Sequence, residues 1–438
     1  MSPKKVVVVG SGITGITAAY FEARKGNSVT LIDSDERAGG LLKSDFSNGQ
    51  YFDYGTHILS ETIIPELNDF LFSDLDCNNC VITDKIETHC YFNGEINFKN
   101  ACVDINSLTE QVYLRACHEL ITASDTAVNN LESFFINRFG KTIYEEIFKN
   151  VSKKYFGVDT HLLSEKMGYF FDMSRVIAFD GPTTKELTKI DKFNRKLGHH
   201  VRESGVAKYY PKVGGIGAIV DLLLEKVDRE GVNLKLSTSI QKVKEEKGKI
   251  ISLLTEDEEI KVDRLVWTLP GSFLTYLSGN PKGFPPKFRN TGLYDFTYKH
   301  PLNLKSVFLN VYDSNLYTGR VTLYQNLSKT NNYSCTVEVL TDHDVNLARL
   351  IDTIQKELIE IGVVDQNNQC VFKQFRPIKS GFPVLTTEFL ESQSELSKYC
   401  ENYFKNVLFV GRNSGQAFFM NDVLTDTFQK VKGESNVK

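Results

Sequence analysis

The chain has 438 residues, which is too long for one ordinary hydrophobic core, so we expect two domains. Hydrophobic residues at 41% and charged residues at 24% describe a soluble globular protein. The 51 basic and 55 acidic side chains give a net charge of −4, which argues against nucleic-acid binding. No run approaches the roughly 20 apolar residues of a membrane span. Because the apolar run after Lys4 and Lys5 breaks at Gly10, we interpret it as a strand, not a signal peptide, and expect a cytoplasmic protein.

The N-terminal stretch has the pattern of a strand, a glycine loop and a helix. Residues 6–9 are valines, residues 10–15 read Gly-Ser-Gly-Ile-Thr-Gly, and apolar residues then recur at helical spacing. A second strand at residues 28–32 ends in Asp33, about 20 positions beyond the loop, as expected for a carboxylate that binds ribose. Such glycines bring a pyrophosphate close to the helix N-terminus. The order of these elements predicts a dinucleotide-binding unit rather than a structural turn.

A second glycine pair follows the acid directly, in the run Glu-Arg-Ala-Gly-Gly-Leu at residues 36–41. This run resembles the FAD-binding start of the family that includes amine oxidases, protoporphyrinogen oxidase and UDP-galactopyranose mutase. Residues 51–58, which read Tyr-Phe-Asp-Tyr-Gly-Thr-His-Ile, resemble the loop that lies beside the flavin ring in that family. The resemblance implies FAD as the cofactor. It also implies that His57 contacts flavin or substrate, whereas the residue alone would be read as a packed loop histidine.

The middle of the chain contains two kinds of hydrophobic pattern. Residues 61–205 show long helical periodicity, and residues 132–157 resemble the helical substrate domain of the mutases, with Phe156 in place of a tryptophan. Residues 285–390 contain alternating stretches that predict strands. The resemblance places Arg175 and Arg320 at a substrate diphosphate, whose paired oxygens match guanidinium groups. A solvated surface cation is the alternative for Arg175.

The C-terminal segment resembles the same family again. An apolar strand at residues 406–410 runs into Gly411 and Arg412, and the helix that follows could hold a flavin oxygen through its N-terminal N–H groups. Gln416 stands where the mutases usually carry a tyrosine. Residues 237–243 fall where that family places backbone on the adenine. The residues expected to bind the cofactor are Gly10, Ser11, Gly12, Ile13, Thr14, Gly15, Asp33, Ser34, Arg37, Gly39, Gly40, Leu41, Gly55, Thr56, His57, Ile240, Gly411, Arg412, Asn421, Asp422 and Val423.

The eight cysteines are scattered along the chain. Cys77 and Cys80 have the spacing of a redox or metal pair, and His89 and Cys90 follow closely. No second pair of this kind occurs, and the context of a thioredoxin-like motif is missing. We therefore expect ordinary reduced thiols and no metal site.

The expected fold is α/β. It comprises a discontinuous Rossmann-type FAD-binding domain of the amine oxidase and UDP-galactopyranose mutase kind, at residues 1–75, 205–280 and 395–438. A mixed helical and antiparallel-sheet substrate domain is expected at residues 76–204 and 281–394. Because the resemblance covers both the mutases and the oxidases, it leaves the type of reaction open.

The leading hypothesis is a flavoenzyme similar to the mutases, an isomerase of polysaccharide biosynthesis. It would contract the ring of a nucleotide-linked sugar by means of reduced flavin, with His57, Arg175 and Arg320 as catalytic residues and NAD(P)H as an external reductant. The alternative is an FAD-dependent oxidoreductase of the amine oxidase or protoporphyrinogen oxidase type, favoured by the absent mutase tyrosine and tryptophan. A non-catalytic flavin-binding scaffold is a third hypothesis. The partner is a small-molecule substrate, and a homodimer is left open.

Overall fold

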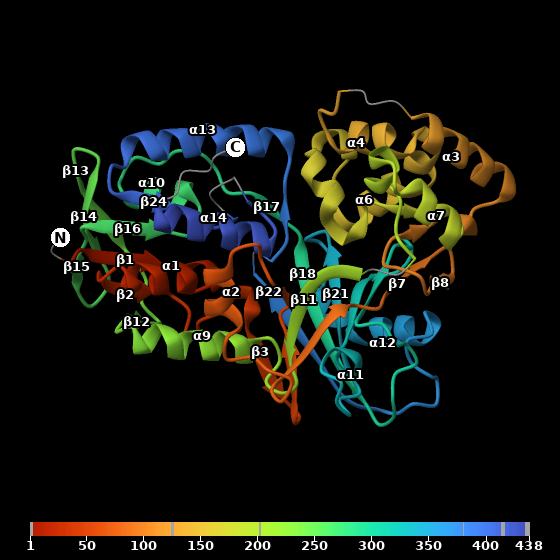
Figure 1. Ribbon diagram of the computed structural model, residues 1–438, viewed down its shortest axis with the longest axis horizontal. Coiled ribbons are helices and arrows are strands. Elements are labelled where there is room, and N and C mark those ends of the chain that lie inside the picture. Colours follow the sequence, from red (N-terminus) through yellow and green to blue (C-terminus); the bar gives the residue numbers. More distant parts are fainter. Residues whose placement is uncertain (1–2, 124–126, 201–202, 380, 413–416, 434–438) are drawn as a thin grey trace.

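The computed structural model describes residues 3–123, 127–200, 203–379, 381–412 and 417–433. Figure 1 shows two halves side by side: a Rossmann-like half on the left, and on the right a helical lobe above a second sheet. In these residues no helix is both long enough and apolar enough to span a bilayer. The α/β fold expected from the sequence is confirmed.

The Rossmann-like half is built on a parallel sheet, five-stranded over the described residues. Its strands, in spatial order, are β12 (Asn233–Lys235), β2 (Ser28–Ile32), β1 (Lys5–Val9), β16 (Arg264–Trp267) and β24 (Val407–Phe409). They come from the three stretches that the sequence assigned to the first domain. Val6 and Val8 of β1 face one core cluster while Val7 and Val9 face another. Both faces of the sheet are therefore covered, which is why its strands are continuous apolar runs.

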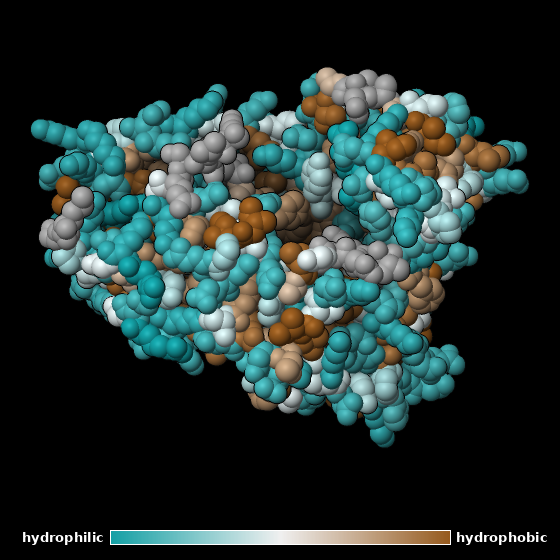
Figure 2. Space-filling view, viewed as in Figure 1, coloured by the Kyte–Doolittle hydropathy of each residue, from teal (hydrophilic) through white to brown (hydrophobic). Residues whose placement is uncertain are grey.

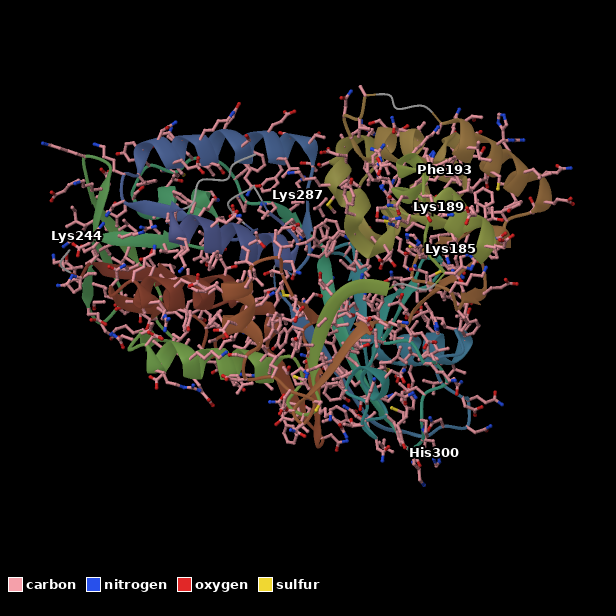
Figure 3. All side chains as sticks on the ribbon, in the orientation of Figure 1. Lys185, Lys189, Phe193, Lys244, Lys287 and His300 are labelled. Carbon is pink, nitrogen blue, oxygen red and sulfur yellow. The ribbon has the colours of Figure 1, made fainter. Side chains whose placement is uncertain are left out.

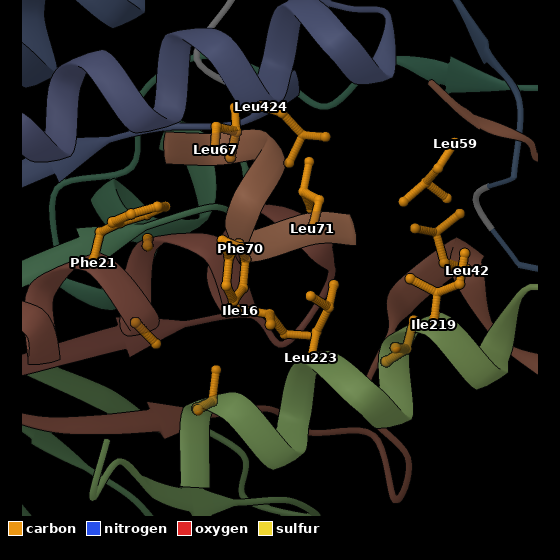
Figure 4. Close-up of a cluster of buried hydrophobic side chains, with 14 of the residues drawn as sticks. Ile16, Phe21, Leu42, Leu59, Leu67, Phe70, Leu71, Ile219, Leu223 and Leu424 are labelled. Carbon is orange, nitrogen blue, oxygen red and sulfur yellow. The ribbon is translucent and has the colours of Figure 1, made fainter. Parts of the chain in front are cut away.

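Helices cover one face of this sheet and contribute most of the larger core cluster. They are α1 (Ile13–Arg24), α2 (Pro65–Phe72), α9 (Gly217–Arg229) and α14 (Met420–Lys432). Figure 4 shows Phe21 of α1, Phe70 of α2 and Leu223 of α9 converging between these helices. Each such side chain is almost fully buried and contributes about 1.5–3 kcal/mol. The packing fixes the start of α1 relative to α14.

The opposite face carries α10 (Gly271–Leu277), α13 (Thr387–Tyr403) and a small antiparallel sheet of β13 (Lys242–Glu246), β14 (Lys249–Leu254) and β15 (Glu259–Lys261). Trp267 is fully buried there. The turn at residues 247–248 joins β13 to β14, and β15 pairs with β14 through a second turn.

The second half is organised by a mixed sheet, seven-stranded in the part of the chain that is described. Its order is β22 (Cys370–Ile378), β18 (Asn290–Tyr298), β21 (Ser334–Thr341), β20 (Thr318–Leu323), β19 (Phe308–Val311), β7 (Thr88–Phe92) and β8 (Glu95–Asn97). Helices α11 (Tyr324–Leu327) and α12 (Ile351–Glu360) lie beside it. Two short antiparallel pairs lie outside this sheet: β3 (Ser44–Ser47) with β4 (Gln50–Asp53), and β17 (Lys287–Phe288) with β23 (Pro383–Val384).

The helical lobe contains α3 (Glu110–Thr122), α4 (Leu131–Phe139), α5 (Lys141–Ile143), α6 (Lys149–Phe156), α7 (Gly181–Leu187) and α8 (Asp191–Asn194). Stacked rings of Phe135 and Phe148, with centroids 4.4 Å apart, form its centre. Lys154 of α6 attaches the lobe to the sheet, because its ammonium donates to three backbone carbonyls, each at 2.8 Å, on residues 311, 313 and 318.

The expectation of helix throughout residues 61–205 was wrong for part of that range. Besides β7 and β8, the stretch forms β6 (Cys80–Lys85), β9 (Val103–Asp104) and β10 (Val176–Ile177). β6 pairs with β11 (Glu203–Pro211), which also pairs with β5 (Leu59–Ser60), and β7 pairs with β19. These partners lie far away in the sequence, and tertiary pairing of this kind decides strand formation more than local pattern does.

A buried polar network joins the two halves. The Asp53 carboxylate at the end of β4 accepts hydrogen bonds from Ser44 Oγ at 2.6 Å and Tyr210 Oη at 2.7 Å. Arg376 of β22 donates Nη2 to the Asp53 carbonyl oxygen at 2.8 Å and Nε to the Asp295 carboxylate at 2.6 Å. The contact between Arg376 and the Asp53 carbonyl oxygen joins the β3–β4 hairpin to the second sheet, so it fixes the chain that immediately follows Asp53.

Candidate cofactor and substrate site

The glycine loop before α1 presents an open strip of backbone. A Cβ added at Gly15 would lie 1.7 Å from the Gly10 carbonyl oxygen, so helix and strand can approach this closely only with glycine there. A Cβ at Gly12 would have no protein atom within 4 Å. Gly12 is also the N-cap of α1, and neither a capping side chain nor an acid in the first turn binds the amides of this end. The first turn of α1, with Ile13 and Thr14, can therefore bind an anion.

The acid at the end of β2 lies beside this loop. Asp33 Oδ2 accepts from the Ser11 backbone N at 2.6 Å and from Ser11 Oγ at 2.7 Å. Ser34 is exposed. Arg37 donates to Asp45 Oδ1 at 2.9 Å and to the Ser44 carbonyl oxygen at 2.6 Å, so it anchors the start of β3.

The second glycine pair lies directly against the first loop. Gly39 and Gly12 form a parallel bridge, and Gly39 N donates to the Ser11 carbonyl oxygen at 2.8 Å. A Cβ on Gly40 would lie 3.3 Å from Gly12 Cα. Two glycine-rich segments thus leave bare backbone along one continuous line, as an extended dinucleotide requires.

The turn at Gly411 lies against the glycine loop at the start of α1. A Cβ on Gly411 would lie 3.1 Å from Thr14 Cγ2, so the turn after β24 contacts the first turn of α1. Asn421 Nδ2 donates to the Glu61 carbonyl oxygen at 3.2 Å, and Val423 is a buried residue of α14. The first turn of α14 carries Asp422. Gln416, where the mutases usually carry a tyrosine, lies outside the described residues.

The segment expected near an adenine runs alongside the end of β2. The backbone N of Thr238 donates to the Asp33 carbonyl oxygen at 2.8 Å, and that of Ser237 donates to the Asp35 carbonyl oxygen at 2.9 Å. Ile240 is partly buried against the core cluster around Trp267.

A cavity of about 510 Å³ opens beyond the glycine loops, between the two halves. In Figure 2 the surface is hollowed there and hydrophobic residues line the hollow. Of the predicted site residues, the cavity is lined by Leu41, Gly55, Thr56, His57, Arg320 and Arg412. We call it the main cavity.

His57 faces the main cavity as a neutral side chain. Its Nε2 is buried and has no hydrogen-bond partner among the described residues. Burial, and then the positive charges of Arg412 and Arg320, lower the pKa of His57 to about 4. An unpaired nitrogen of this kind is available to a bound ligand, as a donor or an acceptor according to the tautomer.

Arg320 is held in place by its neighbours on the sheet. Its Nε donates to Asn310 Oδ1 at 2.9 Å, and its guanidinium lies 4.8 Å from the ring centroid of Phe171 and 5.2 Å from that of Phe308. Glu338 is its register partner on β21. The planar cation therefore stands preorganised in an aromatic frame.

Glu338 is a site residue that sequence reasoning missed. Its Oε1 accepts from Thr56 N at 3.1 Å and Thr56 Oγ1 at 3.2 Å. Its Oε2 and His57 Nε2 each lie 3.6 Å from the position of a Cβ on Gly55, so the two polar atoms flank the same spot. The sequence feature that could have identified Glu338 is that it is the single acid within the alternating pattern of residues 333–339.

Arg175 does not line the main cavity. Its Nη1 donates to the carbonyl oxygens of Leu197, at 2.8 Å, and of Asn194. The structure thus separates Arg175 from Arg320 and gives the cavity a different second cation, Arg412, whose guanidinium lies 4.5 Å from the ring centroid of Phe418.

A smaller, mostly apolar cavity of about 260 Å³ continues from the main one. The two share Tyr169, Phe170, Pro383, Arg412, Phe418 and Phe419. Phe389 and Leu390 of α13 close its far side, and Lys166 and Asp422 also line it. Aromatic walls of this extent suit flat or apolar ligand groups.

The cysteines lie apart from this site. All eight are free thiols; Cys77 is exposed and Cys80 is buried, and burial raises the pKa of Cys80 to about 11. Over the described ranges, no three His, Cys, Asp or Glu side chains come together as they would around a metal ion.

Comparisons with known proteins agree with this architecture. A family model described as an NAD(P)-binding Rossmann-like domain matches residues 8–72. The chain is 24% identical over 275 residues to 1-hydroxycarotenoid 3,4-desaturase of Flavobacterium sp. (strain P99-3). That match covers 58% of this chain and 54% of the desaturase, so the chain spans about half the length of that relative.

Two solved structures match almost the whole chain. Reduced UDP-galactopyranose mutase aligns with a TM-score of 0.78 at 20% identity, over 100% of this chain and 94% of that one. A putative protoporphyrinogen oxidase from Exiguobacterium sp. 255-15 aligns with a TM-score of 0.72 at 15% identity, over 99% of both chains. The resemblance stated from the sequence is confirmed: the chain shares the fold of these two structures and has a Rossmann-like N-terminal domain.

Proposed function

We propose that this protein is an FAD-dependent enzyme that isomerises a nucleotide-linked sugar by ring contraction, in the manner of the UDP-galactopyranose mutases. The observation that carries the proposal is the pairing of Arg320 and Arg412 in one cavity, beside a neutral His57. Two guanidinium groups on one cavity suit a diphosphate, which offers paired oxygens. The full-length likeness to reduced UDP-galactopyranose mutase supports the same assignment.

The residues present fit FAD. The open face of Gly12, the uncapped start of α1 and the adjoining backbone of Gly39 provide a cradle that a Cβ on Gly12 would fill. The contact between Gly411 and Thr14 places the C-terminal turn next to this cradle. When bound, a flavin supplies the electron-rich ring chemistry that no side chain of the chain supplies.

Within this proposal each side chain of the site has a separate role. Arg320 and Arg412 bind the diphosphate as ligand and leaving group, and Arg175 supports the backbone at residues 194–197. His57 orients the flavin or sugar without adding charge, since its pKa of about 4 keeps it neutral. The aromatic walls exclude water and pack against the sugar and base. NAD(P)H is proposed as the reductant of the flavin.

An FAD-dependent oxidoreductase is the second candidate. The apolar cavity of about 260 Å³ that continues from the main one favours it, because such a space suits a hydrophobic substrate better than a nucleotide. The sequence likeness to 1-hydroxycarotenoid 3,4-desaturase supports the same reading.

The test is a titration of FAD-loaded, reduced protein with a panel of nucleotide sugars, followed by product analysis. We expect saturable binding, and isomerisation that needs prior reduction by dithionite or NAD(P)H but no stoichiometric oxygen. Arg320→Gln should weaken binding at least about tenfold, as expected for a charge-assisted hydrogen bond. Arg175→Gln is the matched control and should keep the affinity.

Other outcomes decide against the proposal. A purified protein that is colourless and takes up no FAD would refute both candidates. Oxidised protein that consumes oxygen in proportion to an amine or a ring substrate would establish the oxidoreductase instead. Equal affinity in the Arg320 and Arg175 variants would remove the proposed role of Arg320.

A further inference from the structure

The apolar cavity of about 260 Å³ adjoins a further, small pocket that reaches the surface. This outer pocket lies between α10 and α13, and it shares Pro286, Phe389 and Gln393 with the apolar cavity. Phe284 lines the outer pocket and is 46% exposed, and its ring packs edge-on against that of Phe389 with centroids 6.0 Å apart. The main cavity, the apolar cavity and the outer pocket therefore follow one another, and we call the last two the apolar passage.

Arg412 is common to the main cavity and the apolar passage. Its guanidinium lies 4.5 Å from the ring centroid of Phe418, which lines both spaces. Phe170 packs edge-on against Phe418, with centroids 4.7 Å apart, and its ring lies 5.6 Å from that of Phe419. A cation thus lies where a wall of packed aromatic rings begins. A group esterified to an anion at Arg412 would continue directly along that wall.

The passage offers little to a nucleobase. Among the residues that the structure describes along it, no buried polar side-chain atom lacks a hydrogen-bond partner. Besides Arg412, the charged residues of the apolar cavity are Lys166 and Asp422, and both are exposed. A base carries donors and acceptors along its edge, and burying these without partners costs free energy. An apolar chain has no such cost, and each methylene group that leaves water tightens binding by up to about fourfold.

We propose that the site accepts a sugar joined through a diphosphate to an apolar chain, and that the apolar passage binds the chain. This inference rests on the diphosphate site of the proposed function and adds a ligand class to it. Arg320 and Arg412 bind the diphosphate, and the chain extends past Phe389 toward Phe284. One ligand of this kind accounts for both the two cations and the apolar space beside them.

The test is isothermal titration of the full-length protein, saturated with FAD, with four ligands. These are inorganic pyrophosphate and the dimethylallyl, geranyl and farnesyl diphosphates, each below the concentration at which it aggregates. Saturation with FAD keeps the glycine loop before α1 occupied. We expect the affinity to rise along the series, with farnesyl diphosphate at least about tenfold tighter than pyrophosphate. Arg320→Gln should weaken all four ligands, because they share the diphosphate.

A pair of leucine variants locates the chain. Leu390→Gln places a polar side chain on the far wall of the apolar cavity, so it should weaken farnesyl diphosphate about tenfold and leave pyrophosphate unchanged. The matched control is Leu187→Gln, because Leu187 is also partly buried against the same core cluster. Leu187 lies between Lys185 and Lys189, which Figure 3 shows on the helical lobe, and it lines neither the main cavity nor the apolar passage. This control should bind farnesyl diphosphate as the unaltered protein does.

The chain-length series and the proposed reaction fail separately. A rise along the series that Leu390→Gln removes supports the apolar passage, even where no nucleotide sugar is isomerised. A flat series would overturn it, even where a nucleotide sugar is isomerised. So would equal weakening by Leu390→Gln and Leu187→Gln, or farnesyl diphosphate binding that Arg320→Gln leaves unchanged. Uridine diphosphate that is weakened by Leu390→Gln as much as farnesyl diphosphate would also overturn it, by placing a nucleoside in the passage.

Discussion

The Asp53 carboxyl offers a direct test of how the junction between the two halves is built. It is completely buried, and burial raises its pKa from 3.8 to about 6 even though Ser44, Tyr210 and the backbone of Ile216 donate hydrogen bonds to it. The folded state therefore binds this proton more tightly than the unfolded state does. The group's favourable contribution to stability is complete below about pH 4 and is lost as the pH rises through about 6.

The size of the effect follows from the shift. A rise of about 2 pH units corresponds to about 3 kcal/mol at 1.36 kcal/mol per unit. Asp53→Asn stays neutral at every pH and keeps an acceptor oxygen for Ser44 and Ile216. We expect the variant to exceed the unaltered protein in free energy of unfolding by about 3 kcal/mol at pH 8. The difference should vanish near pH 4.

Urea unfolding between pH 4 and pH 8 measures this difference, with the fluorescence of Trp267, the one tryptophan, as the signal. Ser44→Ala serves as the matched variant. Ser44 lowers the pKa of Asp53, so its removal should move the stability step to higher pH. The reasoning is refuted if Asp53→Asn has no advantage at pH 8, or if its advantage is the same at pH 4.

Three further predictions concern the site and its support. Gly12→Ala should leave urea unfolding unchanged but abolish FAD binding in a spectroscopic titration, because its Cβ meets only open space on the cofactor face. Gly15→Ala, with a Cβ 1.7 Å from a carbonyl oxygen, should instead lower the free energy of unfolding by about 3 kcal/mol. Because the pKa of His57 is about 4, nucleotide-sugar affinity should be flat from pH 6 to 8; a step near pH 6.5 that His57→Gln removes would contradict this. Lys154→Met should lower the free energy of unfolding by about 3 kcal/mol, since three carbonyls lose their donor. The control is the neighbouring Lys153, which is exposed, so Lys153→Met should lower it by less than about 1 kcal/mol.

The Rossmann-like half was predictable because its signals are local. Four valines, a glycine loop, a helical stripe and a second strand fall within the first 32 residues, and each fixes the next. The strand before Gly411 was found for the same reason, because it is a short apolar run ended by a turn. Fully buried parallel strands leave this continuous apolar pattern.

The second half was harder because its strands depend on distant partners. β6 and β7 lie in a region that reads as helical, but they pair with β11 and β19, more than 100 residues away. Prediction of the site residues was limited in the same way. That Glu338 faces the main cavity depends on its register with Arg320 across β20 and β21, and a shift of one residue would turn it to the other face.

The junction network also explains why an ionisable group is buried at such a cost. Arg376, which donates to the Asp53 carbonyl oxygen, lies with its guanidinium 4.9 Å from the ring centroid of Tyr54, and Tyr54 begins the loop that carries His57. The network therefore holds the wall of the main cavity as well as the two halves. If the cost of about 3 kcal/mol at Asp53 is retained because it fixes this wall, the more stable Asp53→Asn protein should bind the nucleotide sugar more weakly. A variant that gained stability and kept full affinity would show instead that the buried carboxyl does not position this wall.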